Sequence, residues 1–272
     1  TAIKTLIDFL LHKGVNGLFL LGSTGEGVLF SVEERKAVAE TVVNHVSGRV
    51  PVVIHVGSHR LDEVIELAQH ASGLCVDGIA VVPPFYYSLN EVALSHFFST
   101  VASAVPDTLM YLYNIPSNVK NQITPTLFSE LYTKHENIVG IKESSQDFAT
   151  FYQFVQNIKE GSVRLVGNDA QFLPALVVGA NGCVSAASTA VPEPFVELFR
   201  AFQAKDWEEA RKWQQVCAEV KRFLVSSCPV SPYKKVLSYR NIIESGVRRP
   251  LRDLTTEETQ NLYSGLSRLG FL

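Results

Sequence analysis

The stretch "IVGIKES" (138–144) is a short apolar run that ends at a lysine, Lys142. Its apolar residues are continuous rather than alternating, which is the pattern of a strand buried on both faces of a parallel sheet. Six further runs share this pattern and end close to Gly, Pro, Asn or Ser. They are "GLFLLGS" (17–23), "PVVIHVG" (51–57), "GIAVVPP" (78–84), "TLMYLYN" (108–114), "RLVGND" (164–169) and "GCVSAAS" (182–188).

Amphipathic segments with helix signals separate these runs. The segment 31–46 opens on Ser31 with Glu34 three residues later, which is the pattern of a capping box. The segment 124–135 opens on Thr124 followed by proline, a favoured residue at the first helical position. Strand and helix therefore alternate at intervals of roughly 30 residues, the length of a βαβ unit.

This alternation predicts an α/β fold, and we favour a (β/α)8 TIM barrel over an open doubly wound sheet. The turn "GSTGEG" (22–27) lacks the glycine pattern of a dinucleotide or nucleotide-phosphate loop. We expect residues 1–14 to form the first helix, so that the first strand is missing from this chain. Further helical segments are expected at 206–224, 232–245 and 255–269. The predicted division is a barrel over 1–203 and a C-terminal helical extension over 204–272, both parts of one structural unit.

Composition narrows the class of partner. The formal net charge is −3 with both signs mixed along the chain, and no basic block indicates nucleic acid or a membrane surface. No apolar run approaches the roughly 20 residues of a membrane span. The four cysteines, Cys75, Cys183, Cys217 and Cys228, have no CxxC pairing and no metal-like spacing with histidine. We therefore predict a reduced, cytoplasmic protein without a metal site.

Lys142 differs from the other lysines, which fall in helical segments or polar loops. An ammonium group buried at a strand end loses hydration, which lowers its pKa. A neutral amine is a nucleophile for carbonyl carbons and gives a Schiff base. The alternative is a lysine whose stem packs at the rim while its head reaches water or pairs with Glu143.

Tyr113 favours the first interpretation. It lies 29 residues before Lys142, one βαβ unit earlier, so the two residues should occupy adjacent strands about 4.8 Å apart. A phenol there can move protons on and off a carbinolamine. A lone tyrosine would more often be a core aromatic residue. The turn that contains Ser23 and Thr24 can present backbone N–H groups to a carboxylate, or can be a tight turn that merely needs glycine.

The ordered motifs "GSTGEG", "PPFYY", "YNIPSN", "IKESS", "GND" and "GCVSAAS" resemble the dihydrodipicolinate synthase/N-acetylneuraminate lyase family over most of the chain. The resemblance implies a barrel with a C-terminal helical extension, assembled as a homotetramer (a dimer of dimers). It also implies a class I aldolase that uses pyruvate and an aldehyde and needs no cofactor.

The resemblance also implies residue roles. Lys142 matches the Schiff-base lysine and Tyr113 the proton-shuttling phenol, while Gly22, Ser23 and Thr24 match the carboxylate-binding turn.

Two further positions match the family pattern. Tyr87 matches the tyrosine that reaches into the neighbouring subunit's proton relay. Val184 matches the position whose backbone carbonyl lies near the site.

Two loops bear on the second substrate. Dihydrodipicolinate synthases carry an arginine that grips the semialdehyde carboxylate where this chain has Asn118, and a neutral amide cannot replace that charged fork. Lys120 could compensate, or could simply be solvated. Asn168 and Asp169 could hold hydroxyl groups of a sugar acid, or Asp169 could cap the following helix.

The predicted function is a lyase that cleaves or forms the bond between pyruvate and an aldehyde in a 2-keto-3-deoxy sugar acid. The alternatives are a 4-hydroxy-tetrahydrodipicolinate synthase and, in another class, a non-catalytic sensor of 2-oxo acids. His55 could point into the barrel mouth as a polar contact, but a lone histidine among apolar neighbours is more often a structural one. Cys183 is interpreted as a small buried apolar residue.

Overall fold

The computed structural model describes residues 2–157, 161–225 and 228–272. The chain forms two compact units: Gly17–Val184, and the residues up to Asn16 together with Ser185–Leu272. Among the residues described, no helix combines the length and the hydropathy of a membrane-spanning segment.

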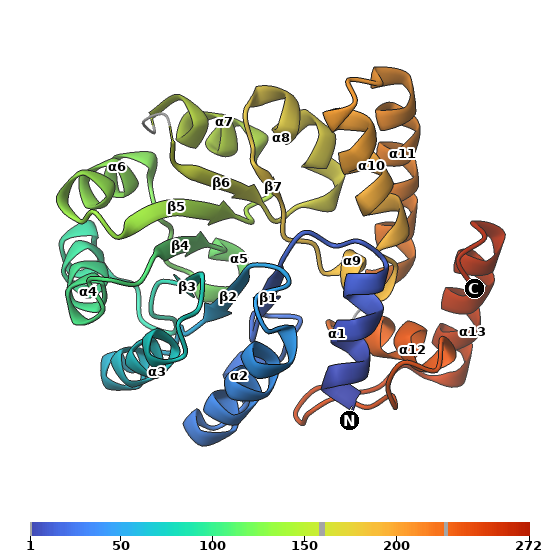
Figure 1. Cartoon of the computed structure of the whole chain (residues 1–272), viewed down its shortest axis with the longest axis horizontal. Coiled ribbons are helices and arrows are strands. Elements are labelled where there is room, and N and C mark those ends of the chain that lie inside the picture. The colour runs from blue at the N-terminus through green and yellow to red at the C-terminus, as the bar shows by residue number, and fades with distance from the viewer. Residues whose placement is uncertain (1, 158–160, 226–227) are drawn as a thin grey trace. The chain divides into compact units, whose positions relative to one another are not determined.

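The unit Gly17–Val184 contains one parallel sheet whose seven strands pair in chain order. Figure 1 shows the sheet curling, with helices along its outer side. Each of the seven apolar runs overlaps one strand, as predicted. The strands are β1 (Leu18–Leu20), β2 (Val52–His55), β3 (Gly78–Val81), β4 (Met110–Asn114), β5 (Ile138–Glu143), β6 (Val163–Val166) and β7 (Gly182–Cys183).

Helices follow the strands along the chain. They are α2 (Val32–Val46), α3 (Leu61–Gly73), α4 (Glu91–Ala104), the short α5 (Pro116–Val119), α6 (Pro125–Lys134), α7 (Phe148–Asn157) and α8 (Phe172–Val178). Two 3-10 turns, η1 (Gly27–Leu29) and η2 (Asp169–Gln171), follow β1 and β6.

The predicted helix starts are confirmed. The Ser31 hydroxyl accepts from the Glu34 N–H (3.2 Å), and the Glu34 carboxylate accepts from the Ser31 N–H (2.9 Å). The Thr124 hydroxyl accepts from the Leu127 N–H (3.1 Å), with proline opening α6. Such a cap stabilises a helix by about 1 kcal/mol because it satisfies backbone donors that have no intrahelical partner.

The second unit is helical. It contains α1 (Ala2–His12), α9 (Ala187–Ala190), α10 (Glu193–Gln203), α11 (Trp207–Leu224), α12 (Ser231–Tyr239) and α13 (Thr256–Arg268). The Glu193 carboxylate binds Lys13 Nζ (2.9 Å) and Arg240 Nη1 (3.0 Å), which joins the ends of three helices. The helix predicted over 232–245 ends earlier, because Asn241 adopts a left-handed φ of 57° and the Ile242 N–H turns back to the Leu237 carbonyl. The division into 1–203 and 204–272 stays a prediction.

Candidate active site

Lys142 and Tyr113 lie side by side at the carboxyl ends of adjacent strands. Their Cα atoms are register partners across β4 and β5, which confirms the adjacent strands that the spacing of 29 residues predicts. Both side chains are buried, with 6% of Lys142 and 3% of Tyr113 exposed. Lys142 Nζ lies 3.8 Å from the centre of the Tyr113 ring and 4.0 Å from the centre of the Phe19 ring. Phe19 comes from β1, so three strands contribute to this amine site.

The rim alternative for Lys142 does not hold, because its head group does not reach bulk water. Glu143, the suggested ion-pair partner, is engaged elsewhere: its Oε2 accepts from Asn114 Nδ2 (2.6 Å) and its Oε1 from the Ser145 N–H (2.5 Å). Successive residues of a strand point to opposite faces, which separates the two side chains.

Two opposing effects act on the amine. Burial lowers the pKa of Lys142, while the hydrogen bond and charge of Tyr113, and the charges of Cys183 and Asp169, raise it to a smaller extent. The faces of two aromatic rings also favour an ammonium group, by about 0.5–2 kcal/mol. Loss of hydration outweighs these contributions, so the fraction of neutral amine exceeds that of a solvated lysine.

The turn after β1 carries Gly22, Ser23 and Thr24. Leu21, immediately before them, adopts a left-handed φ of 58°. The Gly27 N–H donates to the Gly22 carbonyl (3.2 Å) and closes the turn. A Cβ on Gly27 would lie only 1.8 Å from the Leu21 carbonyl oxygen, so this position requires glycine.

His55, at the end of β2, is buried and contacts both this turn and Tyr113. Its Nδ1 lies 3.0 Å from the Leu21 carbonyl oxygen, and its ring packs against the Tyr113 ring at 5.8 Å between centres and 86° between planes. Burial, together with the positive charge of Arg35, lowers the pKa of His55 to about 3. The imidazole is therefore neutral across the physiological range.

Tyr87 lies apart from this cluster within one chain. It is 73% exposed and packs edge-on against Tyr86, with 5.0 Å between ring centres. Asn121 fixes this loop, since its Nδ2 donates to the Pro84 carbonyl (2.6 Å) and the Tyr87 carbonyl (2.8 Å) while its Oδ1 accepts from the Leu89 N–H (2.9 Å).

Asn118 lies on α5 with an exposed side chain whose Oδ1 accepts from the Ser117 hydroxyl (3.0 Å). Lys120, two residues on, is exposed and adopts a φ of 69°, a conformation that glycine adopts without strain. The Asn114 side chain holds the far end of this loop, accepting from the Ile123 N–H (3.0 Å).

The ends of β6 and β7 supply the remaining residues. Asn168 caps the next turn, its Oδ1 accepting from the Ala170 N–H (3.3 Å). Asp169 is 4% exposed, and the half-buried Cys183 thiol donates to its Oδ1 over 3.9 Å. Cys183 is thus a polar neighbour of the site and not only an apolar filler. The Val184 N–H donates to the Val166 carbonyl (2.9 Å), which extends the pairing of β6 and β7.

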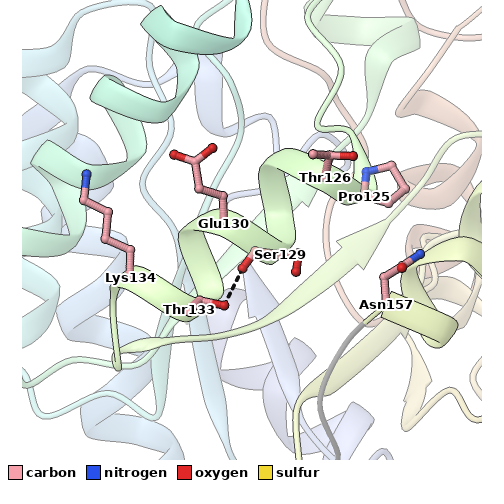
Figure 2. Close-up of a pocket in the computed structure, with 7 residues that line it drawn as sticks. All are labelled: Pro125, Thr126, Ser129, Glu130, Thr133, Lys134 and Asn157. Carbon is pink, nitrogen blue, oxygen red and sulfur yellow. Dashed lines mark hydrogen bonds between the residues drawn. The ribbon is translucent and has the colours of Figure 1, made fainter.

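A separate groove of about 590 Å³ runs along the outer side of α6. Figure 2 shows Glu130 and Lys134 on this helix and Asn157 facing it from α7. Neither Lys142 nor Tyr113 lines it, so the groove does not belong to the amine site.

Sequence reasoning missed Phe19 and undervalued His55. Nothing distinguishes Phe19 from the other apolar residues of "GLFLLGS". His55 carries the same signal as Lys142, a single polar side chain at the end of an apolar run, and that signal could have placed it in the site.

Residues 1–269 match the Dihydrodipicolinate synthetase family. The chain is 34% identical over 267 residues to the 4-hydroxy-tetrahydrodipicolinate synthase of Methanosphaerula palustris, covering 97% of this chain and 90% of the relative. It is 34% identical over 262 residues to the N-acetylneuraminate lyase of Mediterraneibacter gnavus, covering 95% and 82%.

Among solved structures, YagE from Escherichia coli K12 in complex with pyruvate superposes with a TM-score of 0.95 at 31% identity, covering 99% of this chain and 92% of that one. The likeness supports an α/β barrel, in agreement with the curled parallel sheet. The resemblance inferred from the six motifs is confirmed. The chain belongs to the dihydrodipicolinate synthetase family of class I, pyruvate-dependent lyases.

Proposed function

We propose that Lys142 is the nucleophile that forms a Schiff base with pyruvate, or with the 2-oxo end of a longer acid. The observation that carries this proposal is a buried amine, with its pKa lowered by burial, packed against the ring of Tyr113. The neutral amine adds to the ketone carbon, and water leaves to give an iminium ion. The positive nitrogen then accepts the electron pair released when the neighbouring carbon–carbon bond breaks.

Tyr113 is the proposed proton carrier. It would protonate the departing carbinolamine hydroxyl and take the proton from the substrate hydroxyl that becomes the aldehyde. Ser23 of the same chain, together with Tyr87 of the partner subunit, would complete the relay of protons. The exposure of the Tyr87 ring supports this arrangement, because a side chain that reaches another subunit must project from its own.

The turn at Gly22, Ser23 and Thr24 would bind the carboxylate next to the reacting carbonyl, using short hydroxyls and backbone N–H groups. The closing bond from Gly27 and the left-handed Leu21 support a fixed turn. The Val184 carbonyl would lie near the same end of the substrate, since Val184 directly follows β7.

The proposed substrate is a 2-keto-3-deoxy sugar acid, which would be cleaved to pyruvate and a polyhydroxy aldehyde. Asn118 offers an amide where an acidic aldehyde would need a cation, while Asn168 and Asp169 supply polar groups for hydroxyls. The second candidate is 4-hydroxy-tetrahydrodipicolinate synthase activity. It is favoured by Lys120, which keeps a strained conformation at this loop and supplies a positive charge.

The remaining predictions belong to the same proposal. They are a helical extension over 204–272, assembly as a homotetramer, and a cytoplasmic location. No cofactor is required by the proposed steps, since the iminium nitrogen is itself the electron sink.

Borohydride reduction in the presence of pyruvate tests the central claim. We expect a stable pyruvate-derived mass increment on the peptide that contains Lys142. The variant Lys142→Met should lose the increment, and the control Lys4→Met, which alters an exposed lysine of α1, should keep it. A mark on another lysine, or none in the wild type, would remove the aldolase assignment.

A panel of aldehydes with pyruvate tests the substrate class. We expect polyhydroxy aldehydes to react faster than aspartate semialdehyde. Asn118→Arg should raise the relative rate with the semialdehyde, because a guanidinium group can bind its carboxylate through two hydrogen bonds. Efficient turnover of the semialdehyde by the wild type would favour the second candidate.

A further inference from the structure

His55 contacts two parts of the site that the chain supplies from different strands. Its ring lies against Tyr113 of β4, and its Nδ1 faces the carbonyl of Leu21, just after β1. A carbonyl oxygen can only accept, so Nδ1 carries the hydrogen and Nε2 carries a lone pair. Among the described residues, Nε2 has no hydrogen-bond partner.

The space around the imidazole fits this orientation of the ring. A Cβ on Gly57 would lie 2.6 Å from Nε2 and 2.5 Å from a methyl group of Val82, so glycine makes room for the ring. Behind the strand, buried Arg35 donates to the His55 carbonyl (2.7 Å) and to the Gly57 carbonyl (3.0 Å). Arg35 therefore holds the backbone at His55 and again two residues later at Gly57.

The Leu21 carbonyl is confined from two directions. On one side His55 donates to it, and on the other the Cα of Gly27 packs so closely that any side chain would collide with it. Leu21 is buried and left-handed, a conformation that is strained for a bulky residue. Its conformation sets the direction in which residues 22–24 leave β1.

We propose that His55 is a positioning residue that sets the carboxylate-binding turn, through the Leu21 carbonyl, and the phenol of Tyr113, through its ring. This inference rests on the proposed function of the same site. One rigid side chain would thus fix the distance between the group that holds the substrate carboxylate and the group that moves protons. Fixing this distance matters for the rate, because a misplacement of reacting groups by about 1 Å can lower the rate about 100-fold.

Two substitutions separate the two contacts. His55→Asn keeps an N–H close to the place of Nδ1 and removes most of the ring, whereas His55→Phe keeps a ring against Tyr113 and removes the donor. For His55→Phe we expect the KM for pyruvate to rise about tenfold, the factor that corresponds to about 1.4 kcal/mol, with a small change in kcat. For His55→Asn we expect kcat to fall about tenfold while the KM stays within about twofold of the wild type.

The opposite split, equal losses in both variants, or no loss in either would overturn the proposal. A measurement on the wild type does not depend on the variants folding: nitrogen-15 NMR should show one imidazole that stays neutral and protonated at Nδ1. An Nε2–H tautomer or an imidazolium would also overturn it. Absence of the Lys142 adduct in the wild type is a different result, which removes the proposed function itself.

Discussion

Replacing Lys142 with methionine should stabilise the fold at neutral pH while abolishing Schiff-base formation. Methionine has a similar length and keeps the apolar contacts of the lysine stem, but it carries no group that must be dehydrated. The prediction therefore links the buried amine to a measurable cost in the free energy of unfolding.

The magnitude follows from two terms. Each unit by which burial lowers the pKa of Lys142 corresponds to about 1.4 kcal/mol of lost stability while the amine is protonated in the unfolded chain. The contacts of Lys142 Nζ with the Tyr113 and Phe19 rings, at 3.8 and 4.0 Å, offset part of this lost stability. We expect a net gain of about 1–2 kcal/mol, typical of removing a functional polar group from a site. Each kcal/mol raises the melting temperature by about 2–4 °C.

The dependence on pH has a fixed sign. Between the lowered pKa of the folded state and the ordinary lysine pKa of 10.5, the unfolded chain holds a proton that the folded chain releases. The stability of the wild type therefore rises with pH through this window, and the advantage of methionine shrinks toward pH 10.5.

Thermal melts of both proteins at about pH 7 and about pH 10 measure this difference. Lys4→Met, on the exposed side of α1, is the control and should change neither value. If Lys142→Met melts at or below the wild-type temperature at about pH 7, or if its advantage grows with pH, the amine is not desolvated and the reasoning is wrong.

Two further substitutions test the geometry. Tyr113→Phe should lower kcat by about 100-fold or more, because the proposed proton carrier is lost while the ring that packs on Lys142 remains. Tyr111→Phe on the same strand is the control, and equal losses in the two variants would contradict the role proposed for Tyr113. Gly27→Ala should lower the melting temperature and weaken pyruvate binding, because its Cβ would lie 1.8 Å from the Leu21 carbonyl oxygen. Gly73→Ala is the control, since a Cβ there meets nothing within 4 Å. Wild-type affinity in Gly27→Ala would show that the turn is not rigid.

Much of the fold could be predicted because its signals are local. A strand buried on both faces must be apolar along its length, so the seven runs were visible without any tertiary information. The capped helix starts were visible for the same reason. The end of α12 was not, because it depends on Asn241 adopting a left-handed conformation that the sequence allows but does not require.

The site was predicted in part. Lys142 stood out because a charge is rare at the end of an apolar strand, and Tyr113 because it lay one βαβ unit before it. The contacts of His55 were not predictable. In a sequence, a buried polar residue that positions two parts of a site looks the same as one that only satisfies its own hydrogen bonds. Only the positions of the Leu21 carbonyl and the Tyr113 ring distinguish these cases for His55.

The pairing of Tyr113 with Lys142 itself depends on an irregularity that spacing alone does not reveal. At the start of the two strands Met110 pairs with Ile138, an offset of 28 residues (138 − 110), but the register then shifts so that Tyr111 pairs with Gly140. Without that shift Tyr113 would pair with Ile141, and the amine of Lys142 would point to the opposite face of the sheet. Bulges of this kind occur next to active sites because they re-aim a side chain. Lys142 and Tyr113 therefore face each other because one extra residue in β5 precedes Lys142. Any change that restored the regular register would separate the two side chains while leaving both residues in place.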